Sequence, residues 1–331
     1  MKLATLKNGR RDGRLVIVSR CLARAIDAAP IADTMQQAIE QWARVEPALQ
    51  ERYAALNADA LPGAFAFDPS EAAAPLSRAY QFVDASAFLN HGNIMERAYD
   101  LHVKKTAGVP ILIQRQGDDF RGPREDYAYP SEDDQGDFEG EFAVVLDDVP
   151  AGVGAREALG HVKLLTIFND VSMRAHLFRE LSMGFGFIQA KPASVFAPVA
   201  VTPDELGDAW FDGRVHLAMR VERNGEWFGH PDGGEMDFSF GELICHLAYN
   251  RKLGAGTIVG SGTVSNKNYH EVGSACLAER RAIEVIEHGA PRTSFLRFGD
   301  RLRFEVLGKD GASIFGAIEH RLVPATTGGA A

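Results

Sequence analysis

Two glutamates spaced two residues apart are the side chains in this sequence best suited to chemistry. Glu139 and Glu141 lie in the segment 137–146, which reads Asp-Phe-Glu-Gly-Glu-Phe-Ala-Val-Val-Leu. The apolar and aromatic neighbours predict a strand, on which residues two apart point to the same face. Like charges repel and burial penalises each of them further, whereas a divalent cation relieves both penalties because hard cations bind carboxylate oxygens. The pair therefore indicates a metal site, with two hydrated glutamates on a solvent-facing strand as the alternative.

Two further motifs place polar side chains where predicted strands end. An apolar run predicts a buried strand over 163–168 that leads directly to Asp170, and functional side chains are often placed at such ends. If the chain after this strand is helical, Asp170 and Arg174 share one face of the helix. The aromatic-rich segment 185–189 predicts a strand that ends at Lys191, just before a proline. Taken alone, Lys191 is also compatible with a surface lysine at the entrance of a loop.

In the order in which they occur, these motifs resemble those of the fumarylacetoacetate hydrolase family. That order is Glu-Gly-Glu on a strand, Asn-Asp-Val-Ser-x-Arg, a lysine at a strand end and a glycine-rich segment. The remaining segments of the resemblance are Ala-Phe-Leu-Asn-His at 87–91, Gly-Ser-Gly-Thr-Val-Ser at 260–265, Val-Gly-Ser at 272–274 and Phe-Gly-Asp-Arg-Leu at 298–302. The resemblance runs from about Tyr80 to Val323. It implies an α+β, strand-rich fold, a mixed β-roll or sandwich of the fumarylacetoacetase C-terminal type.

The resemblance also implies roles for single residues. Glu139, Glu141 and Asp170 would bind Mg²⁺ or Ca²⁺, and Lys191 would stabilise a developing oxyanion. His91 would be the general base that activates water, since the pKa of a histidine lies near working pH. The family's substrates carry a 1,3-dicarbonyl or 2-oxo acid unit that chelates the cation through two oxygens. The implied reaction is hydrolysis of a carbon–carbon bond in a diketo acid, such as fumarylacetoacetate or an acylpyruvate, in the catabolism of aromatic compounds such as tyrosine.

Three positions depart from the family pattern. Short family members have a glutamate three residues after the histidine, whereas here the nearest glutamate is Glu96. Fumarylacetoacetases have a further metal-ligand aspartate, and its position aligns with Ala87, so that Asp84 is expected to lie out of register. The glutamate that pairs with the catalytic histidine is displaced by two residues, to Glu279. Glu96 and Glu279 are therefore both candidate partners of His91, and Glu279 is our candidate for the catalytic group.

The resemblance also concerns substrate binding and leaves two other classes of protein open. Arg174 would bind a substrate carboxylate, and Thr263 would point into a pocket whose wall is formed by backbone. The same scaffold resembles decarboxylases, hydratases and isomerases of 2-oxo acids, which need no hydrolytic water and would be favoured by a mispositioned His91. The other alternative is a non-enzymatic metal-binding or regulatory homologue whose residues 1–75 recruit partners, but the retained Lys191 and carboxylates argue against it.

Composition excludes several classes of protein. The chain of 331 residues is 46% hydrophobic and 24% charged, which is ordinary for a globular protein, and is long enough for two domains. Its net charge of −10 and the lack of a basic run argue against a nucleic-acid partner. Three cysteines without a Cys-x-x-Cys motif predict a cytoplasmic location and no structural zinc, and no signal peptide or membrane span is expected. The family resemblance implies a homodimer.

The chain is expected to consist of a small N-terminal domain, residues 1–75, and a catalytic domain, residues 76–325. The N-terminal domain contains a predicted hairpin formed by 3–6 and 15–19, a helix over 34–56 and a linker over 57–75. The predicted strands of the catalytic domain are 110–114, 139–146, 163–168, 185–189, 214–223, 256–260 and 301–307. Its predicted helices are 91–104, 172–182 and 240–251.

Overall fold

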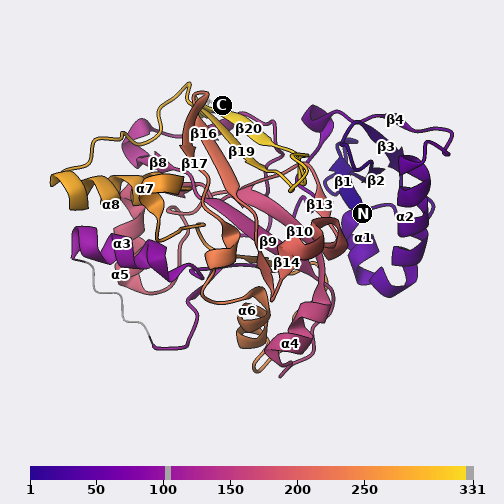
Figure 1. Cartoon of the computed structure of the whole chain (residues 1–331), viewed down its shortest axis with the longest axis horizontal. Coiled ribbons are helices and arrows are strands. Elements are labelled where there is room, and N and C mark those ends of the chain that lie inside the picture. Colours follow the sequence, from indigo (N-terminus) through magenta and orange to yellow (C-terminus); the bar gives the residue numbers. More distant parts are fainter. Residues whose placement is uncertain (101–105, 326–331) are drawn as a thin grey trace, which may run out of the picture.

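The computed structural model describes residues 1–100 and 106–325 and has the strand-rich α+β fold that the sequence predicts. The N-terminal strands and helices lie together at one side, and the rest of the chain forms a larger body with several sheets (Figure 1). None of the helices in the described ranges is long and apolar enough to cross a membrane.

One sheet joins the N-terminal segment to the rest of the chain. Within the described residues it has eleven strands in the order β4-β3-β2-β1-β13-β10-β9-β18-β5-β6, with β12 paired to β10. These strands are β1 (Lys2–Leu6), β2 (Arg14–Val18), β3 (Arg24–Asp27), β4 (Phe65–Ala66), β5 (Phe82–Ala85), β6 (Leu112–Arg115), β9 (Gly140–Leu146), β10 (Val162–Asn169), β12 (Val195–Phe196), β13 (Ala200–Val201) and β18 (Ile258–Gly260). Strands β5 and β18 run parallel, whereas β9 is antiparallel to both of its neighbours, β10 and β18.

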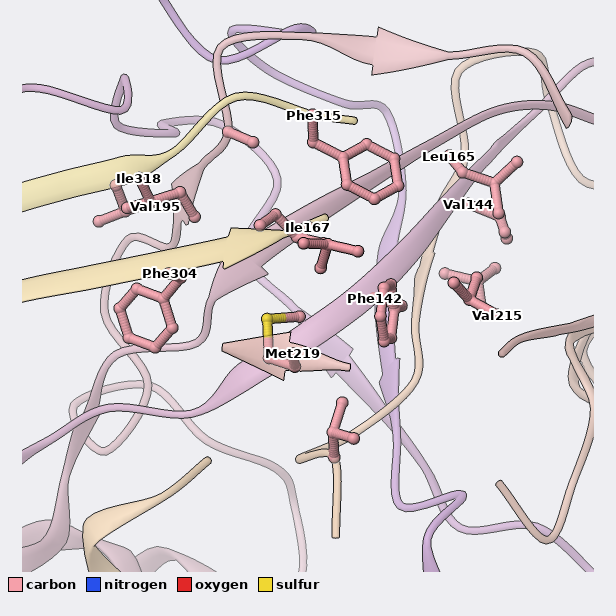
Figure 2. Close-up of a cluster of buried hydrophobic side chains, with 14 of the residues drawn as sticks. Phe142, Val144, Leu165, Ile167, Val195, Val215, Met219, Phe304, Phe315 and Ile318 are labelled. Carbon is pink, nitrogen blue, oxygen red and sulfur yellow. The ribbon is translucent and has the colours of Figure 1, made fainter. Parts of the chain in front are cut away.

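The central strands β9 and β10 are buried on both faces, and alternate side chains enter two different cores. Phe142 and Val144 of β9 pack with Leu165 and Ile167 of β10 in a cluster that also contains side chains of a second sheet (Figure 2). The intervening side chains of β9 and β10 pack in another cluster with the N-terminal strands and helices. Because both faces of these strands are covered, their sequences are almost continuously apolar.

The second sheet covers one face of the first and has the order β17-β16-β19-β20-β7. Its strands are β7 (Tyr127–Tyr129), β16 (Met219–Arg223), β17 (Glu226–Gly229), β19 (Arg301–Val306) and β20 (Ile318–Pro324). Two short ribbons complete the strands of the described chain: β8 (Gly136–Asp137) with β11 (Ser172–Met173), and β14 (Trp210–Phe211) with β15 (Arg214–Val215).

The helices pack in pairs or cover the N-terminal strands. They are α1 (Met35–Glu40), α2 (Trp42–Asn57), α3 (Leu89–Tyr99), α4 (Ala155–Ala158), α5 (Arg174–Met183), α6 (Phe240–Leu247), α7 (Tyr269–Val272) and α8 (Leu277–His288). Helices α1 and α2 pack on β1, β2 and β3, whereas α3 packs against α8 and α4 packs against α6. The pairing of α3 with α8 matters for the site because each helix carries one of its residues.

The predicted strand over 185–189 is wrong. This segment is an exposed turn after α5, because Gly184 and Gly186 adopt φ angles of 74° and 103° and reverse the chain direction. Lys191 consequently lies in a loop and not at the end of a strand. The predicted helix over 34–56 is also divided, because Gln41 takes a non-helical conformation between α1 and α2.

The other predicted elements are present with shifted ends. The N-terminal hairpin is confirmed as the antiparallel pair β1–β2. The predicted strand 214–223 is split into β15 and β16, and the predicted linker 57–75 contains β4. The helix predicted over 91–104 runs from Leu89 to Tyr99, and residues 101–104 of that prediction lie outside the described residues. The division at residue 75 stays a prediction, since side chains from both sides of it share one core cluster.

Candidate metal centre and active site

The register between β9 and β10 brings the two acidic motifs of the sequence together. Glu141, near the start of β9, lies opposite Phe168, near the end of β10. Asp170 directly follows β10, and its backbone N–H donates to the carbonyl oxygen of Glu139 at 2.8 Å. Antiparallel pairing therefore places the start of one strand beside the end of the next, and the carboxylates of Glu139, Glu141 and Asp170 are buried in one cluster.

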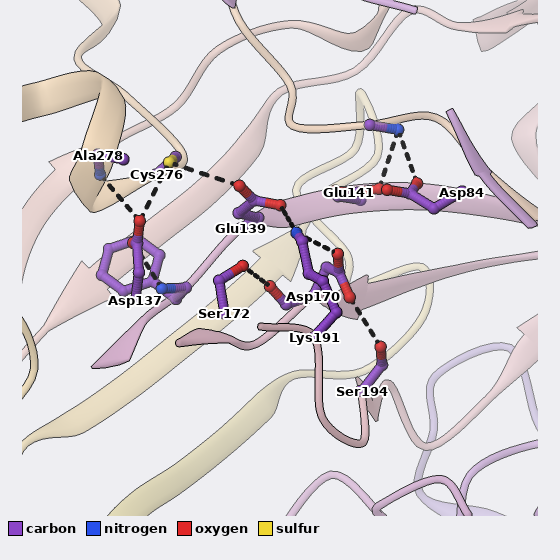
Figure 3. A network of polar contacts seen from close by, with 12 residues as sticks. Asp84, Asp137, Glu139, Glu141, Asp170, Ser172, Lys191, Ser194, Cys276 and Ala278 are labelled. Carbon is purple, nitrogen blue, oxygen red and sulfur yellow. Dashed lines mark hydrogen bonds and ion pairs between the residues drawn. The ribbon is translucent and has the colours of Figure 1, made fainter. Parts of the chain in front are cut away.

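Asp84 belongs to the same cluster, so the expectation that it lies out of register is wrong. One carboxylate oxygen each of Asp84, Glu141 and Asp170 lies within 4.8 Å of the others. The backbone N–H of Gly262 donates to Asp84 Oδ1 at 3.2 Å and to Glu141 Oε2 at 2.9 Å (Figure 3). Asp84 reaches this place because β5 pairs with β18, which in turn pairs with β9. A Cβ on Gly260 would lie 2.5 Å from Asp84 Oδ1, so a glycine is needed there to admit the carboxylate.

Three cationic side chains surround these carboxylates. Lys191 Nζ donates to Glu139 Oε2 and to Asp170 Oδ2, each at 2.6 Å (Figure 3). Arg115 Nη1 donates to Asp170 Oδ1 at 2.7 Å, and this buried arginine was not found from the sequence. Arg174 donates from Nη2 to Glu139 Oε1. Each of the three cations thus neutralises Glu139 or Asp170 and leaves Asp84 and Glu141 without a cationic partner of their own among the described side chains.

The loop that carries Lys191 is held by another carboxylate that the sequence did not reveal. Glu180 of α5 is buried and accepts hydrogen bonds from the backbone N–H groups of Ile188, Gln189 and Ala190, at 2.9, 2.9 and 3.1 Å. These three donors directly precede Lys191. Glu180 therefore fixes the position of this loop, which a strand was expected to do. The sequence gives no sign of this role, because acidic residues are common in predicted helices.

His91 is paired with Glu279 in the structure. Its Nδ1 lies 2.8 Å from Glu279 Oε2, and Ser274 Oγ donates to the other oxygen of Glu279 at 2.7 Å. A ring nitrogen of His91 also lies within 4.8 Å of a carboxylate oxygen of Glu139, which places the imidazole beside the carboxylate cluster. Of the two candidate partners, the packing of α3 on α8 selects Glu279 rather than Glu96.

Thr263, a predicted substrate-binding residue, makes no side-chain hydrogen bond with the carboxylates of the site among the described residues. Its side chain is mostly buried, but its hydroxyl makes no hydrogen bond to any residue in the described ranges. The contribution of this glycine-rich segment that can be seen is the backbone N–H of Gly262, which binds two of the carboxylates.

Burial and mutual repulsion keep two of the carboxyl groups from ionising easily. Burial, followed by the charges of Asp84 and Asp170, raises the pKa of Glu141 well above its usual range. Burial and the charge of Asp170 raise the pKa of Asp84 to about 6. Both groups therefore ionise only at a considerable free-energy penalty while no cation is bound.

Glu139, which contacts Lys191 and Arg174, ionises more easily than an ordinary glutamate. Burial alone would raise the pKa of Glu139, but the charges of Lys191 and Arg174 outweigh burial and hold this pKa below its usual range. Burial would lower the pKa of Lys191, but Asp170 and Glu139 raise it above its usual range. These carboxylate contacts therefore keep Lys191 protonated at neutral pH in the metal-free protein.

The charges and donors of this cluster fit one divalent cation bound through oxygen. Glu141 Oε1 is buried and accepts no hydrogen bond from the described residues. In the described chain the cluster combines five carboxylates with three cations, namely Asp84, Asp137, Glu139, Glu141 and Asp170 with Arg115, Arg174 and Lys191. The carboxylates outnumber these cations, and an all-carboxylate donor set suits Mg²⁺, Ca²⁺ or Mn²⁺.

Comparison with known proteins identifies the family of this chain. The family model described as fumarylacetoacetase N-terminal domain 2 matches residues 1–78, and the model described as fumarylacetoacetate (FAA) hydrolase C-terminal matches residues 81–323. Among solved structures, maleylpyruvate hydrolase from Sphingobium sp. SYK-6, in complex with manganese(II) and pyruvate, superposes with a TM-score of 0.67. The superposition covers 98% of this chain and 100% of that one at 16% sequence identity, so the likeness concerns the fold.

Curated relatives match over a shorter stretch. The 2,4-didehydro-3-deoxy-L-rhamnonate hydrolase of Sphingomonas sp. (strain SKA58) is 29% identical over 157 residues, which cover 46% of this chain and 52% of that protein. The oxaloacetate tautomerase FAHD2B of Homo sapiens, a mitochondrial protein, is 27% identical over 157 residues, covering 46% of this chain and 48% of that protein. The chain thus spans about half the length of the curated relatives it matches. Since the C-terminal family model alone matches most of the sequence, this chain belongs to the fumarylacetoacetate hydrolase family.

Proposed function

We propose that this protein is a divalent-metal-dependent hydrolase that cleaves a carbon–carbon bond in a diketo acid of the acylpyruvate type. The observation that carries the proposal is the buried carboxylate group of Asp84, Glu141 and Asp170, which has excess negative charge and lies beside Lys191 and the His91–Glu279 pair. The neighbour crystallised with manganese(II) and pyruvate supports a 2-oxo acid product. In the proposed reaction water adds to the acyl carbonyl, and the products are a carboxylic acid and pyruvate.

Asp84, Glu141, Asp170 and Glu139 would hold the cation, which would act as a Lewis acid toward the two oxygens of the dicarbonyl unit. Lys191, fixed as a cation between Glu139 and Asp170, stabilises negative charge that develops on a substrate oxygen. The protein does not need to reorganise for this, because the ammonium group is already in place.

His91 supplies the proton transfer in this proposal. Its Nδ1–H donates to Glu279, which fixes the tautomer and leaves Nε2 as the acceptor for a proton of the attacking water. The buried carboxylate of Glu279 then stabilises the imidazolium that forms. Nε2 subsequently returns the proton to the carbon that leaves, so that the pyruvate methyl group is completed.

A second candidate function is tautomerisation or decarboxylation of a 2-oxo acid. The ion pairs of Lys191 with Glu139 and Asp170 favour this function. They could stabilise the negative charge of an enolate without any contribution from His91. The relationship to an oxaloacetate tautomerase supports it as well. This reaction needs no hydrolytic water.

A panel of acylpyruvates and oxaloacetate tests the two functions directly. The purified protein is supplied with Mg²⁺, Mn²⁺ or Ca²⁺, and loss of the ultraviolet absorbance of the diketo acid or of the oxaloacetate enol is followed. We expect hydrolysis of at least one acylpyruvate, with stoichiometric pyruvate, and none after chelation of the cation. Accelerated interconversion of oxaloacetate tautomers without any hydrolysis would replace the first function by the second.

Lys191→Met is expected to lower the turnover number by about 10²–10³-fold, as for the loss of one preorganised oxyanion donor. The reason is that Lys191 is charged in the free enzyme and acts on charge that develops during the reaction. Steady-state kinetics at saturating cation measure the effect. A raised KM with unchanged turnover would show instead that Lys191 only binds the ground state. Lys252→Met, which removes an exposed lysine, is the matched control.

The metal-free protein is expected to lose stability as the pH rises from about 4 to about 6. Asp84 has its pKa raised from 3.8 to about 6, so the folded state binds more protons than the unfolded state between these values. The free energy of unfolding therefore falls through this window, by on the order of 3 kcal/mol for such a shift, and the raised pKa of Glu141 extends the loss to higher pH. Melting temperatures in chelator and in Mn²⁺ should coincide near pH 4 and diverge as the pH rises. Parallel curves would contradict a cation site at these carboxylates.

A further inference from the structure

We propose that Asp137 is a positioning residue that holds the guanidinium of Arg174 toward the carboxylate cluster and ties it to the start of α8. Asp137 lies two residues before Glu139 and is completely buried. Its role as a positioning residue for catalysis rests on the proposed function. The orientation of Arg174 that Asp137 maintains is independent of that function and can be measured in the free protein.

The carboxylate of Asp137 accepts five hydrogen bonds. Both oxygens are used, and the donors come from three separate segments of the chain. Figure 3 shows the contacts of Asp137 with Cys276 and Ala278. Oδ1 accepts from the backbone N–H of Phe138 at 2.7 Å and of Leu277 at 2.9 Å. Oδ2 accepts from the backbone N–H of Ala278 at 3.0 Å, from Arg174 Nε at 2.7 Å and from Cys276 Sγ at 3.6 Å. A carboxylate with this many donors is fixed in position and fixes its partners in turn.

The contact with Arg174 decides which end of the guanidinium can meet a substrate. Nε is bound to Asp137 and Nη2 to Glu139, so the side of the guanidinium formed by these two nitrogens is used inside the protein. Nη1 makes no hydrogen bond to the described residues, and the side chain is 11% exposed. The substrate carboxylate that the family resemblance implies for Arg174 would therefore approach the end formed by Nη1 and Nη2. Without Asp137, the guanidinium could rotate and lose this direction.

The contact of Asp137 with α8 also affects the position of His91, the proposed base, through Glu279. Leu277 and Ala278 are the first two residues of α8, and their N–H groups have no partner within the helix. A buried carboxylate at this end satisfies them and is favoured by the helix dipole. The next residue of α8 is Glu279, which holds His91. One side chain thus connects the residue that would recognise the substrate with the residue that orients the base.

The neighbouring cluster of His91, Glu139 and Cys276 is better explained by this arrangement than by a second metal ion. Its donor atoms lie within 4.8 Å of one another, but Arg174 Nη2 contacts Glu139 Oε1 and lies 3.5 Å from Cys276 Sγ. The positive charge that this cluster requires is therefore already supplied by Arg174, which Asp137 holds in place.

Asp137→Asn tests the proposal because it preserves shape while one oxygen becomes an NH₂ group that cannot accept. We expect kcat/KM for the best diketo acid to fall by about 10–100-fold, as for other residues that orient a functional group. The loss should appear largely in KM. Across free acids and their methyl esters, the variant should reproduce the pattern of Arg174→Met, and adding Arg174→Met to it should have little further effect. A merely structural role would lower all substrates equally and would add to the effect of Arg174→Met.

A second, independent experiment measures the contact between Asp137 and Arg174 without any substrate. The ¹H–¹⁵N signal of the Arg174 Nε–H group should be protected from exchange in the metal-free protein and lose its protection in Asp137→Asn. Cys276→Ser, which retains an acceptor at the start of α8, should keep the protection. If Asp137→Asn does not fold, Asp137→Ser replaces it, since the shorter, uncharged side chain removes the charged partner of Arg174. Wild-type protein without hydrolase activity would refute the proposed function alone, whereas unchanged protection of Arg174 in a folded Asp137 variant would overturn the positioning role.

Discussion

Glu141→Gln is expected to abolish divalent-cation binding and, with it, catalytic turnover. Glu141 is completely buried, one of its oxygens accepts no hydrogen bond from the described residues, and its neighbours Asp84 and Asp170 repel its charge. Glutamine keeps the volume and can still accept from Gly262, but it removes the charge that a hard cation requires. Titration calorimetry with Mn²⁺ should therefore give no measurable heat, and kinetics should show the activity of chelator-treated wild-type protein.

The same substitution should stabilise the metal-free protein at neutral pH. Removing one of several mutually repelling buried carboxylates relieves the repulsion and the desolvation penalty that raise its pKa. A higher melting temperature in chelator, combined with the loss of cation binding, separates a lost ligand from a damaged fold. Glu51→Gln, which neutralises an exposed carboxylate on α2, should change neither property. Wild-type Mn²⁺ affinity in Glu141→Gln would remove this residue from the metal site.

His91→Ala is expected to lower hydrolysis by about 10²–10⁴-fold, the usual contribution of a general base. The structure supports this size of effect because the imidazole is oriented by the buried Glu279 and lies beside Glu139. Tautomerisation or decarboxylation of oxaloacetate should be largely spared, since it requires no activated water. Parallel assays of pyruvate release from an acylpyruvate and of oxaloacetate conversion measure the difference.

Added imidazole should restore part of the hydrolysis in His91→Ala, because a base from solution can occupy the space left by the side chain. His270→Ala removes an exposed histidine that also pairs with a glutamate, Glu287, and is the matched control. If His91→Ala hydrolyses acylpyruvates at nearly the wild-type rate, His91 is not the base, and the function that needs no hydrolytic water becomes the better description.

The sequence by itself determined the family, the strand-rich fold and the residues of two acidic motifs. These features depend on local patterns, because alternation of side chains along a strand and short spacings such as that of Glu139 and Glu141 are properties of neighbouring residues. The hairpin of β1 and β2 and most strands of the two sheets were predictable for the same reason. Residues 185–189 were not, since aromatic content predicted a strand where Gly184 and Gly186 turn the chain.

Only the tertiary structure decided how the site is completed. Asp84 enters it through the pairing of β5 with β18, and Arg115 reaches it from β6. Asp137 is close to Glu139 in the sequence, but its contacts with Arg174 and α8 are made by the tertiary structure. The choice of Glu279 as partner of His91 depends on the packing of α3 against α8. These contacts join segments separated by many residues, so no local pattern specifies them. They form because a carboxylate or a guanidinium can be buried only where other buried groups supply its hydrogen bonds and opposite charge.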